Sequence, residues 1–131
     1  MRKSASLEFK SSAFGVKEGE DAHTQPGVFG KSLAQWFAEQ LRARGIAAGA
    51  IVARDFGWCV PVESSGPHRL YAACVNAGPE PGQWRVFACA EGGWMARLLG
   101  KDQSRAAITA LFGNLKQVLQ NASHVRELRD A

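Results

Sequence analysis

Alternating hydrophobic and polar positions predict several β-strands along this chain. Leu7 and Phe9 alternate with charged residues in a first candidate strand, and such period-2 alternation is typical of a strand with one buried face. Trp58, Val60 and Val62 repeat the pattern after a turn at Asp55 and Gly57, two ordinary turn residues. The predicted strands cover 6–14, 46–53, 58–63, 68–77 and 83–91, and the charged tail 123–131 could add a last one.

Two other segments carry the spacing of an amphipathic helix. In the first, Leu33, Trp36, Phe37 and Leu41 fall on one face of a helix that starts at about 29 or 32 and ends near 44. We expect Ser32 to cap its N-terminus. The second helix is predicted from about Asp102 to 121. Its apolar stripe consists of Ile108, Leu111, Phe112, Leu115, Val118, Leu119 and Ala122.

These elements predict an α+β fold in two layers. Consecutive strands joined by short turns pair antiparallel, and the two helices must cover one face of the resulting sheet. We therefore expect a mostly antiparallel sheet of about five strands with two amphipathic helices on one face, in the order β-α-β-β-β-β-α. The chain is long enough for one domain over 1–131, with 1–5 and 129–131 frayed. The helix-covered face should carry Trp58, Val60, Val62, Trp84, Val86 and Ala88 against Leu33, Phe37, Leu111, Phe112 and Leu115.

Composition places the chain among ordinary globular proteins, with 46% hydrophobic and 21% charged residues. Charged residues at Glu8 and Lys10 interrupt the apolar run that a signal peptide would need, and no stretch has the length of a membrane span. We therefore expect a cytoplasmic protein. The net charge is +4, but the basic residues are scattered and form no Lys/Arg block, which argues against nucleic-acid binding.

No residue pattern in the sequence indicates catalysis, a metal or a cofactor. Cys59, Cys74 and Cys89 are odd in number, isolated along the chain and set in apolar segments, so we expect buried thiols. The three histidines stand in no local signature with a cysteine. We therefore expect a protein that is not an enzyme, with no cofactor and no metal.

Two short motifs suggest known nucleotide or magnesium sites but lack the required context. Gly30-Lys31-Ser32 ends like a phosphate-binding loop, yet Gln25 stands where the first glycine belongs and no buried strand precedes it. Asp55-Phe56-Gly57 matches the magnesium-binding segment of protein kinases, but the chain lacks the kinase catalytic loop. The simpler interpretations are a helix start and a turn.

Three segments together resemble a family of small bacterial α+β proteins. The segments are 26–36, which fits Pro-Gly-x-x-Gly-x-x-Leu-Ala-x-Trp, then Gly45-Ile46, and then the turn Asp55-Phe56-Gly57-Trp58. The family turn is usually Asp-Trp-Gly-Trp, so this chain departs from it at Phe56. The resemblance covers roughly residues 5 to 130 and implies a bacterial source and a fold. It implies no particular reaction.

The hypothesis that remains is binding to a protein partner. The segment 15–27 is a long irregular loop that gathers acids on an otherwise basic chain, and such loops on rigid scaffolds often carry binding residues. We expect an immunity-like protein that neutralises a partner such as a basic toxin domain; a homodimer is also compatible. The alternative is a small-molecule-binding domain with a pocket between sheet and helix. The candidate contact residues are Glu18, Glu20, Asp21, Asp55 and Trp94.

Overall fold

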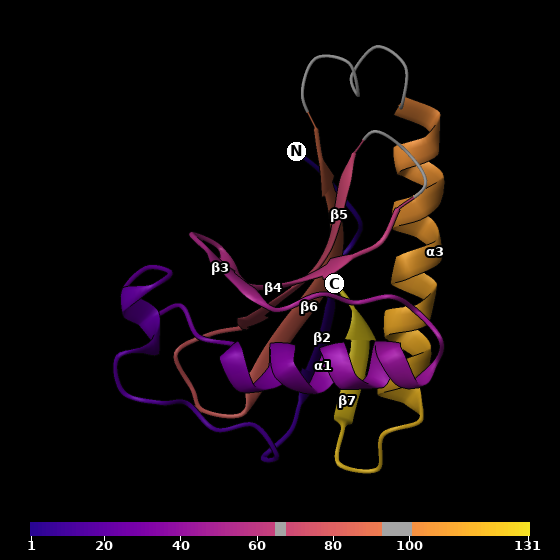
Figure 1. Cartoon of the computed structure of the whole chain (residues 1–131). Coiled ribbons are helices and arrows are strands. Elements are labelled where there is room, and N and C mark those ends of the chain that lie inside the picture. The colour runs from indigo at the N-terminus through magenta and orange to yellow at the C-terminus, as the bar shows by residue number, and fades with distance from the viewer. Residues whose placement is uncertain (65–67, 93–100) are drawn as a thin grey trace.

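The alternating segments pair into one antiparallel sheet of seven strands (Figure 1). The computed structural model describes residues 1–64, 68–92 and 101–131. Within these residues the strand order is β3-β4-β5-β6-β2-β7, and the short β1 also pairs with β6. The strands are β1 (Arg2–Lys3), β2 (Leu7–Lys10), β3 (Val52–Arg54), β4 (Gly57–Val62), β5 (Arg69–Asn76), β6 (Gln83–Glu91) and β7 (Arg126–Asp130).

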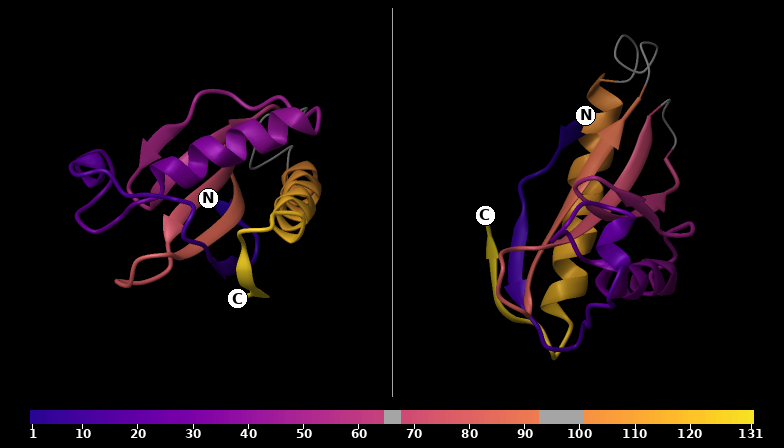
Figure 2. Two further views of the ribbon diagram at one scale, coloured as in Figure 1. Left: turned by 90° about the horizontal axis from the view of Figure 1, so that it is seen from below. Right: turned by 90° about the vertical axis from the view of Figure 1, so that its left-hand side faces the viewer.

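Two helices cover one face of this sheet, as the sequence predicted. α1 (Lys31–Ala43) contacts β4 and β5, whereas α3 (Lys101–Gln120) contacts β6, β5 and β1. The two helices run in clearly different directions on that face (Figures 1 and 2). The short helix η1 (Glu20–Ala22) lies in the loop beyond the N-terminal end of α1. The α+β class is therefore confirmed.

The core lies between the helices and the sheet, on the face that the alternation predicted. Trp84, Val86 and Ala88 of β6 are buried there together with Leu33 and Phe37 of α1. Leu111 and Leu115 of α3 belong to the same buried cluster, and Phe112 packs against it half-buried. Because side chains of a strand alternate between faces, the parity of β4 and β6 was sufficient to select these residues.

The strand count and some boundaries differ from the prediction. Of the predicted strand 46–53, only β3 (Val52–Arg54) joins the ladder, apart from an isolated bridge between Ala48 and Val62. This part of the chain is rich in alanine and glycine, which offer little side chain to pack on a sheet. The chain ends, for which we expected fraying, are also paired: Ser4 N donates to Ala88 O, and Ala131 N donates to Ser6 O.

A second, smaller apolar cluster lies on the face of the sheet opposite the helices. It consists of Cys59, Tyr71, Ala73, Phe87 and Cys89, with Phe56 packed against it. Phe56 lies in the turn between β3 and β4, and its ring is 6.1 Å from that of Phe87 on β6, centroid to centroid.

Candidate functional site

The loop before α1 is held in place by the carboxylate of Glu20. Its Oε2 accepts hydrogen bonds from the backbone amides of Gly30 and Lys31, both at 3.1 Å, and its Oε1 accepts one from Lys17 N at 2.8 Å. Glu20 is only 5% exposed. A carboxylate at a helix N-terminus satisfies free amides and favours the helix dipole. The predicted cap Ser32 was therefore wrong: the N-cap residue is Gly30, and a side chain from ten residues earlier supplies the bonds.

Two further contacts fix the remainder of the loop. Asp21 Oδ2 accepts a hydrogen bond from Gly27 N at 3.0 Å, which closes the segment on itself. Gln25 Nε2 donates to the backbone oxygen of Asp55 at 3.0 Å and so joins the loop to the β3–β4 turn. The long loop is therefore ordered by its own polar side chains.

Asn76, at the end of β5, connects this loop to the β5–β6 hairpin. Its Oδ1 accepts a hydrogen bond from Phe29 N at 3.0 Å, and its Nδ2 donates to Gly27 O and Gly78 O, each at 3.1 Å. The backbone adds a bond from Asn76 N to Phe29 O. One side chain thereby fixes the distance between two segments that are far apart in the sequence.

A hollow of about 760 Å³ lies between the two connected segments. The loop contributes Phe14 to Val16, Gly27 and Phe29, and the hairpin contributes Asn76 and the run from Gly78 to Trp84. Most of these residues are apolar, glycine or proline, and Glu80 is the one charged residue among them. Val16, which lines the hollow, is 52% exposed.

Buried aromatic rings give this hollow a rigid base. Phe14 and Trp84, which both line it, meet edge to face with ring centroids 6.1 Å apart. Phe14 also contacts Trp36 at 5.3 Å and His124 at 5.4 Å, and Trp84 Nε1 donates to Ser11 O at 3.3 Å. Because the rings are fixed on several sides, the hollow is a formed feature of the fold.

The residues proposed from the sequence occupy different environments. Glu18 and Asp55 are exposed, Asp21 is half-buried, and Glu20 is buried and bonded to backbone amides. The bond from Gln25 brings the turn of Asp55 beside the loop. Because the Glu20 carboxylate is buried and bonded to backbone amides, it is not part of the surface that we propose for partner contact. Trp94 lies outside the described residues.

Sequence reasoning missed the hairpin side of the hollow. The segment 78–82, Gly-Pro-Glu-Pro-Gly, lies between two predicted strands and has the composition of an ordinary turn. The available signal was Asn76, a polar residue at the end of an apolar strand just before that turn. An Asn side chain can both donate and accept, which suits it to joining backbone segments.

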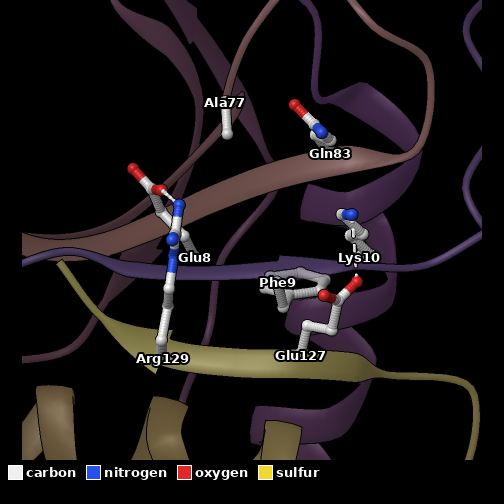
Figure 3. A pocket seen from close by; sticks show the side chains of 7 residues that line it. All are labelled: Glu8, Phe9, Lys10, Ala77, Gln83, Glu127 and Arg129. Carbon is white, nitrogen blue, oxygen red and sulfur yellow. Dashed lines mark hydrogen bonds and ion pairs between the residues drawn. The ribbon is translucent and has the colours of Figure 1, made fainter.

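A second, more polar hollow of about 260 Å³ adjoins the same hairpin through Gln83 (Figure 3). Glu8 and Lys10 of β2 and Glu127 and Arg129 of β7 line it. Lys10 Nζ lies 3.0 Å from Glu127 Oε2, while Arg129 donates to Glu8 Oε1 at 2.8 Å. The charged groups of this hollow are thus paired with one another.

The three cysteine thiols are buried in the sheet and are not available for chemistry at the surface. All three cysteines are free and buried, as predicted, and burial raises the pKa of Cys59 to about 12 and that of Cys89 to about 11. The pKa of Cys74 is also raised well above its ordinary value by burial. Thiols with such pKa values are poor nucleophiles at neutral pH.

Two serines contact histidines but lack the geometry of a catalytic triad. Ser11 Oγ lies 3.0 Å from His124 Nδ1, yet Ser11 is fully buried. Ser64 Oγ lies 2.7 Å from His68 Nε2. His68 Nδ1, the atom that a carboxylate orients in a triad, accepts or donates no hydrogen bond among the residues that the structure describes. Within the described ranges, no three His, Cys, Asp or Glu residues are grouped closely enough to hold a metal ion.

Comparisons with protein-family models, with curated proteins and with solved structures found no match to this chain. Among the residues that the structure describes, no helix combines the length and apolar character needed to cross a membrane.

Proposed function

We propose that this protein is a non-catalytic binding module that holds an exposed segment of a protein partner in the hollow between the 15–27 loop and the β5–β6 hairpin. The observation that carries the proposal is the hollow itself, about 760 Å³, with aromatic rings at its base and both walls joined by Asn76. A preformed site loses little conformational entropy when it binds.

The rim of the hollow favours a protein partner over a small molecule. Val16, Pro79 and Pro81 are exposed beside it. A small ligand buries most of its own surface in an enclosing pocket, whereas an exposed apolar rim is the kind of surface that a protein interface covers. An apolar side chain of the partner would occupy the hollow, and its neighbours would cover the rim.

Acidic residues at and near the hollow indicate which charge a partner would carry. Glu80 lines the hollow, and Glu18 is exposed on the loop. We infer that the bound segment carries Lys or Arg beside its apolar side chain, since complementary charge accelerates encounter and disfavours other partners. A basic toxin domain, neutralised in an immunity-like manner by a cytoplasmic bacterial protein, would meet this requirement. The resemblance of 26–36 and 55–58 to a bacterial family fits that proposal.

A random-peptide library displayed on phage tests this proposal without knowledge of the natural partner. We expect selected peptides to combine a large apolar residue with a neighbouring Lys or Arg. Val16→Ser should weaken their binding by about tenfold, roughly 1.4 kcal/mol. Val52→Ser is the matched control, because Val52 is also a surface valine, 39% exposed, but lies on β3.

Glu80→Lys provides a second, electrostatic readout. It should weaken binding of the basic peptides most at low ionic strength, where exposed charges interact most strongly. Equal binding by Val16→Ser, Glu80→Lys and Val52→Ser would contradict the proposal. If only small apolar molecules bind, and do so at the hollow, the alternative of a small-molecule-binding domain replaces it; the volume lies within the range of roughly 300–1,000 Å³ for such sites.

A further inference from the structure

Several basic residues that are scattered in the sequence lie on the face of the sheet opposite α1 and α3. Within the described part of the chain no helix covers this side, the helix-free face. The register places Lys3 opposite Cys89, Arg69 opposite Glu91, and Arg129 opposite Glu8, all on that face. Among the described residues the face carries seven basic residues and three acids: Lys3, Lys10, Arg54, Arg69, Arg85, Arg126 and Arg129, with Glu8, Glu91 and Glu127. This excess of four positive charges equals the net charge of the sequence, +4.

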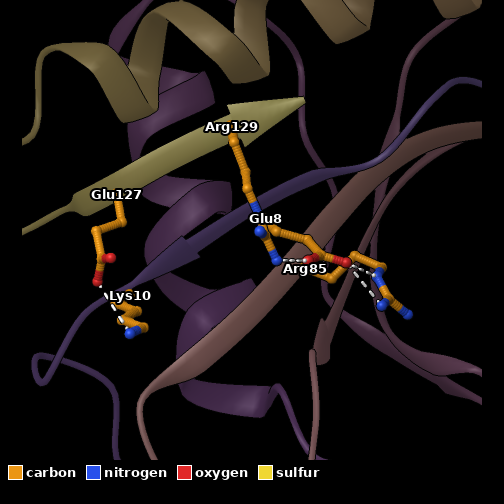
Figure 4. Close-up of polar contacts among 5 residues, drawn as sticks. All are labelled: Glu8, Lys10, Arg85, Glu127 and Arg129. Carbon is orange, nitrogen blue, oxygen red and sulfur yellow. Dashed lines mark hydrogen bonds and ion pairs between the residues drawn. The ribbon is translucent and has the colours of Figure 1, made fainter. Parts of the chain in front are cut away.

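Each acid on this face is outnumbered by the cations around it. Glu8 accepts hydrogen bonds from both Arg85, at 2.7 Å, and Arg129, at 2.8 Å (Figure 4). These bonds, that of Arg85 first, lower the pKa of Glu8 and keep it charged. Near the other end of β6, Glu91 accepts two hydrogen bonds from Arg54, at 2.7 and 2.9 Å, and lies opposite Arg69.

The cations are distributed along the length of β6. Each lies on β6, on a neighbouring strand opposite Glu91, Cys89, Arg85 or Gln83, or in contact with one of these positions. From Glu91 to Gln83 a strand spans about 26 Å, at ~3.3 Å per residue. Repeated positive charge along a line suits a linear polyanion better than a compact acidic patch.

We propose that the helix-free face of the sheet binds single-stranded nucleic acid through its phosphate backbone. Five of the seven cations are arginines, and the planar guanidinium group bonds phosphate oxygens with two parallel donors. Tyr71 and Phe87 are 8% and 7% exposed, so their rings offer almost no surface for stacking bases. Half-buried Phe56 offers partial ring surface. The face therefore contacts phosphates and does not discriminate between bases.

Fluorescence anisotropy with labelled oligothymidylate tests the proposal on the full chain. We expect binding that weakens steeply with salt, because each phosphate contact contributes about −0.7 to the slope of log K against log salt concentration for a single strand. The variant Arg69→Gln with Arg126→Gln removes two exposed cations of the face. It should make the slope shallower by about 1.4.

The matched control removes the same charge elsewhere. Lys17 in the loop and Arg105 on α3 are exposed and lie off this face, so Lys17→Gln with Arg105→Gln should leave the slope unchanged. Three results would each overturn the proposal: no salt-dependent binding, an equal loss in the control, or equally tight binding of polyglutamate. The last would identify the face as a site for an acidic polypeptide.

Discussion

Gly30 and Gly57, one in each of the motif segments 26–36 and 55–58, both approach the same backbone carbonyl of β5. Gly30 precedes α1 and Gly57 begins β4, and both have a positive φ, 149° and 151°. A Cβ atom would lie 2.4 Å from Cys74 O if built on Gly30 and 2.6 Å if built on Gly57. The start of the helix and the start of the strand thus both approach one carbonyl of β5 more closely than a side chain allows.

Substitution of either glycine should therefore be costly. Gly30→Ala or Gly57→Ala combines a clash with backbone and a strained φ, and we expect a loss of more than about 2 kcal/mol in the free energy of unfolding. Gly113→Ala is the control, because Gly113 lies in α3 and, apart from its neighbours in the chain and the backbone of its own helix, no described atom lies within 4 Å of a Cβ built on it. It should stabilise the protein by about 0.5–1 kcal/mol. Urea unfolding measures all three; a small cost at Gly30 would refute the close approach.

The acidic residues of the 15–27 loop have different roles: Glu20 is a buried cap of α1, whereas Glu18 is exposed at the surface. Glu20→Ala leaves the amides of Lys17, Gly30 and Lys31 without their acceptor, and should cost about 1–2 kcal/mol as a lost helix cap. Glu18→Ala, at an exposed neighbour, should stay within about 0.5 kcal/mol of the wild type. Thermal unfolding of the two variants distinguishes the roles, and equal stabilities would show that Glu20 does not cap α1.

At the scale of elements, α3 contributes to the core through a stripe that the sequence predicted. Leu115 is fully buried in the helix-side cluster. We expect Leu115→Ala to cost about 2–5 kcal/mol, because it leaves a cavity that the surroundings fill only in part. Thr109→Ala, an exposed position on the same helix, is the control. If denaturant unfolding gives Leu115→Ala the small cost of a surface change, the packing of α3 on the sheet is wrong.

The buried faces of strands and helices could be predicted where the hydrophobic periodicity is strong. Features that depend on contacts between distant parts of the chain could not. The buried face of β6 follows from period-2 alternation, and the buried faces of both helices follow from the helical spacing of their apolar residues. The cap on α1 could not be predicted, because Glu20 reaches Gly30 across ten residues of irregular chain. The hollow depends on the hydrogen bonds of Asn76 to Phe29 and Gly27, which lie 47 and 49 positions earlier in the chain. Local sequence patterns do not encode contacts over such separations.

In the whole molecule, the basic face is a feature that could not be predicted from the sequence. Its cations lie on β1, β2, β3, β5, β6 and β7, and they share a face only once strand order and register are known. The sequence shows merely that no Lys/Arg block exists. Sheet topology, set by long-range pairing of β2 between β6 and β7, is what gathers them.

The ion pairs of this face predict how stability depends on pH. The pKa values of Glu8 and Glu91 are lowered in the folded protein, chiefly by hydrogen bonds from Arg85 and Arg54 respectively. A lowered carboxyl pKa stabilises the fold above the unfolded value, about 4.3, and this contribution is lost as pH falls through the folded pKa. The stability gap between wild type and Glu8→Gln should therefore be full at pH 7 and should narrow below about pH 4. Thermal unfolding across pH measures it, with exposed Glu39→Gln as control; an equal narrowing there would assign the effect to net charge.

The hollow between the 15–27 loop and the β5–β6 hairpin is the proposed binding site for a partner. The most direct measurement is a two-dimensional amide NMR titration of the labelled protein with a library-selected peptide. We expect the largest shift changes at residues 14–16, 27–29 and 76–84, with little change on the basic face of β6 or on the exposed side of α3. Shift changes that cluster away from the hollow, or binding that is unchanged in Val16→Ser, would show that the hollow is not the binding site.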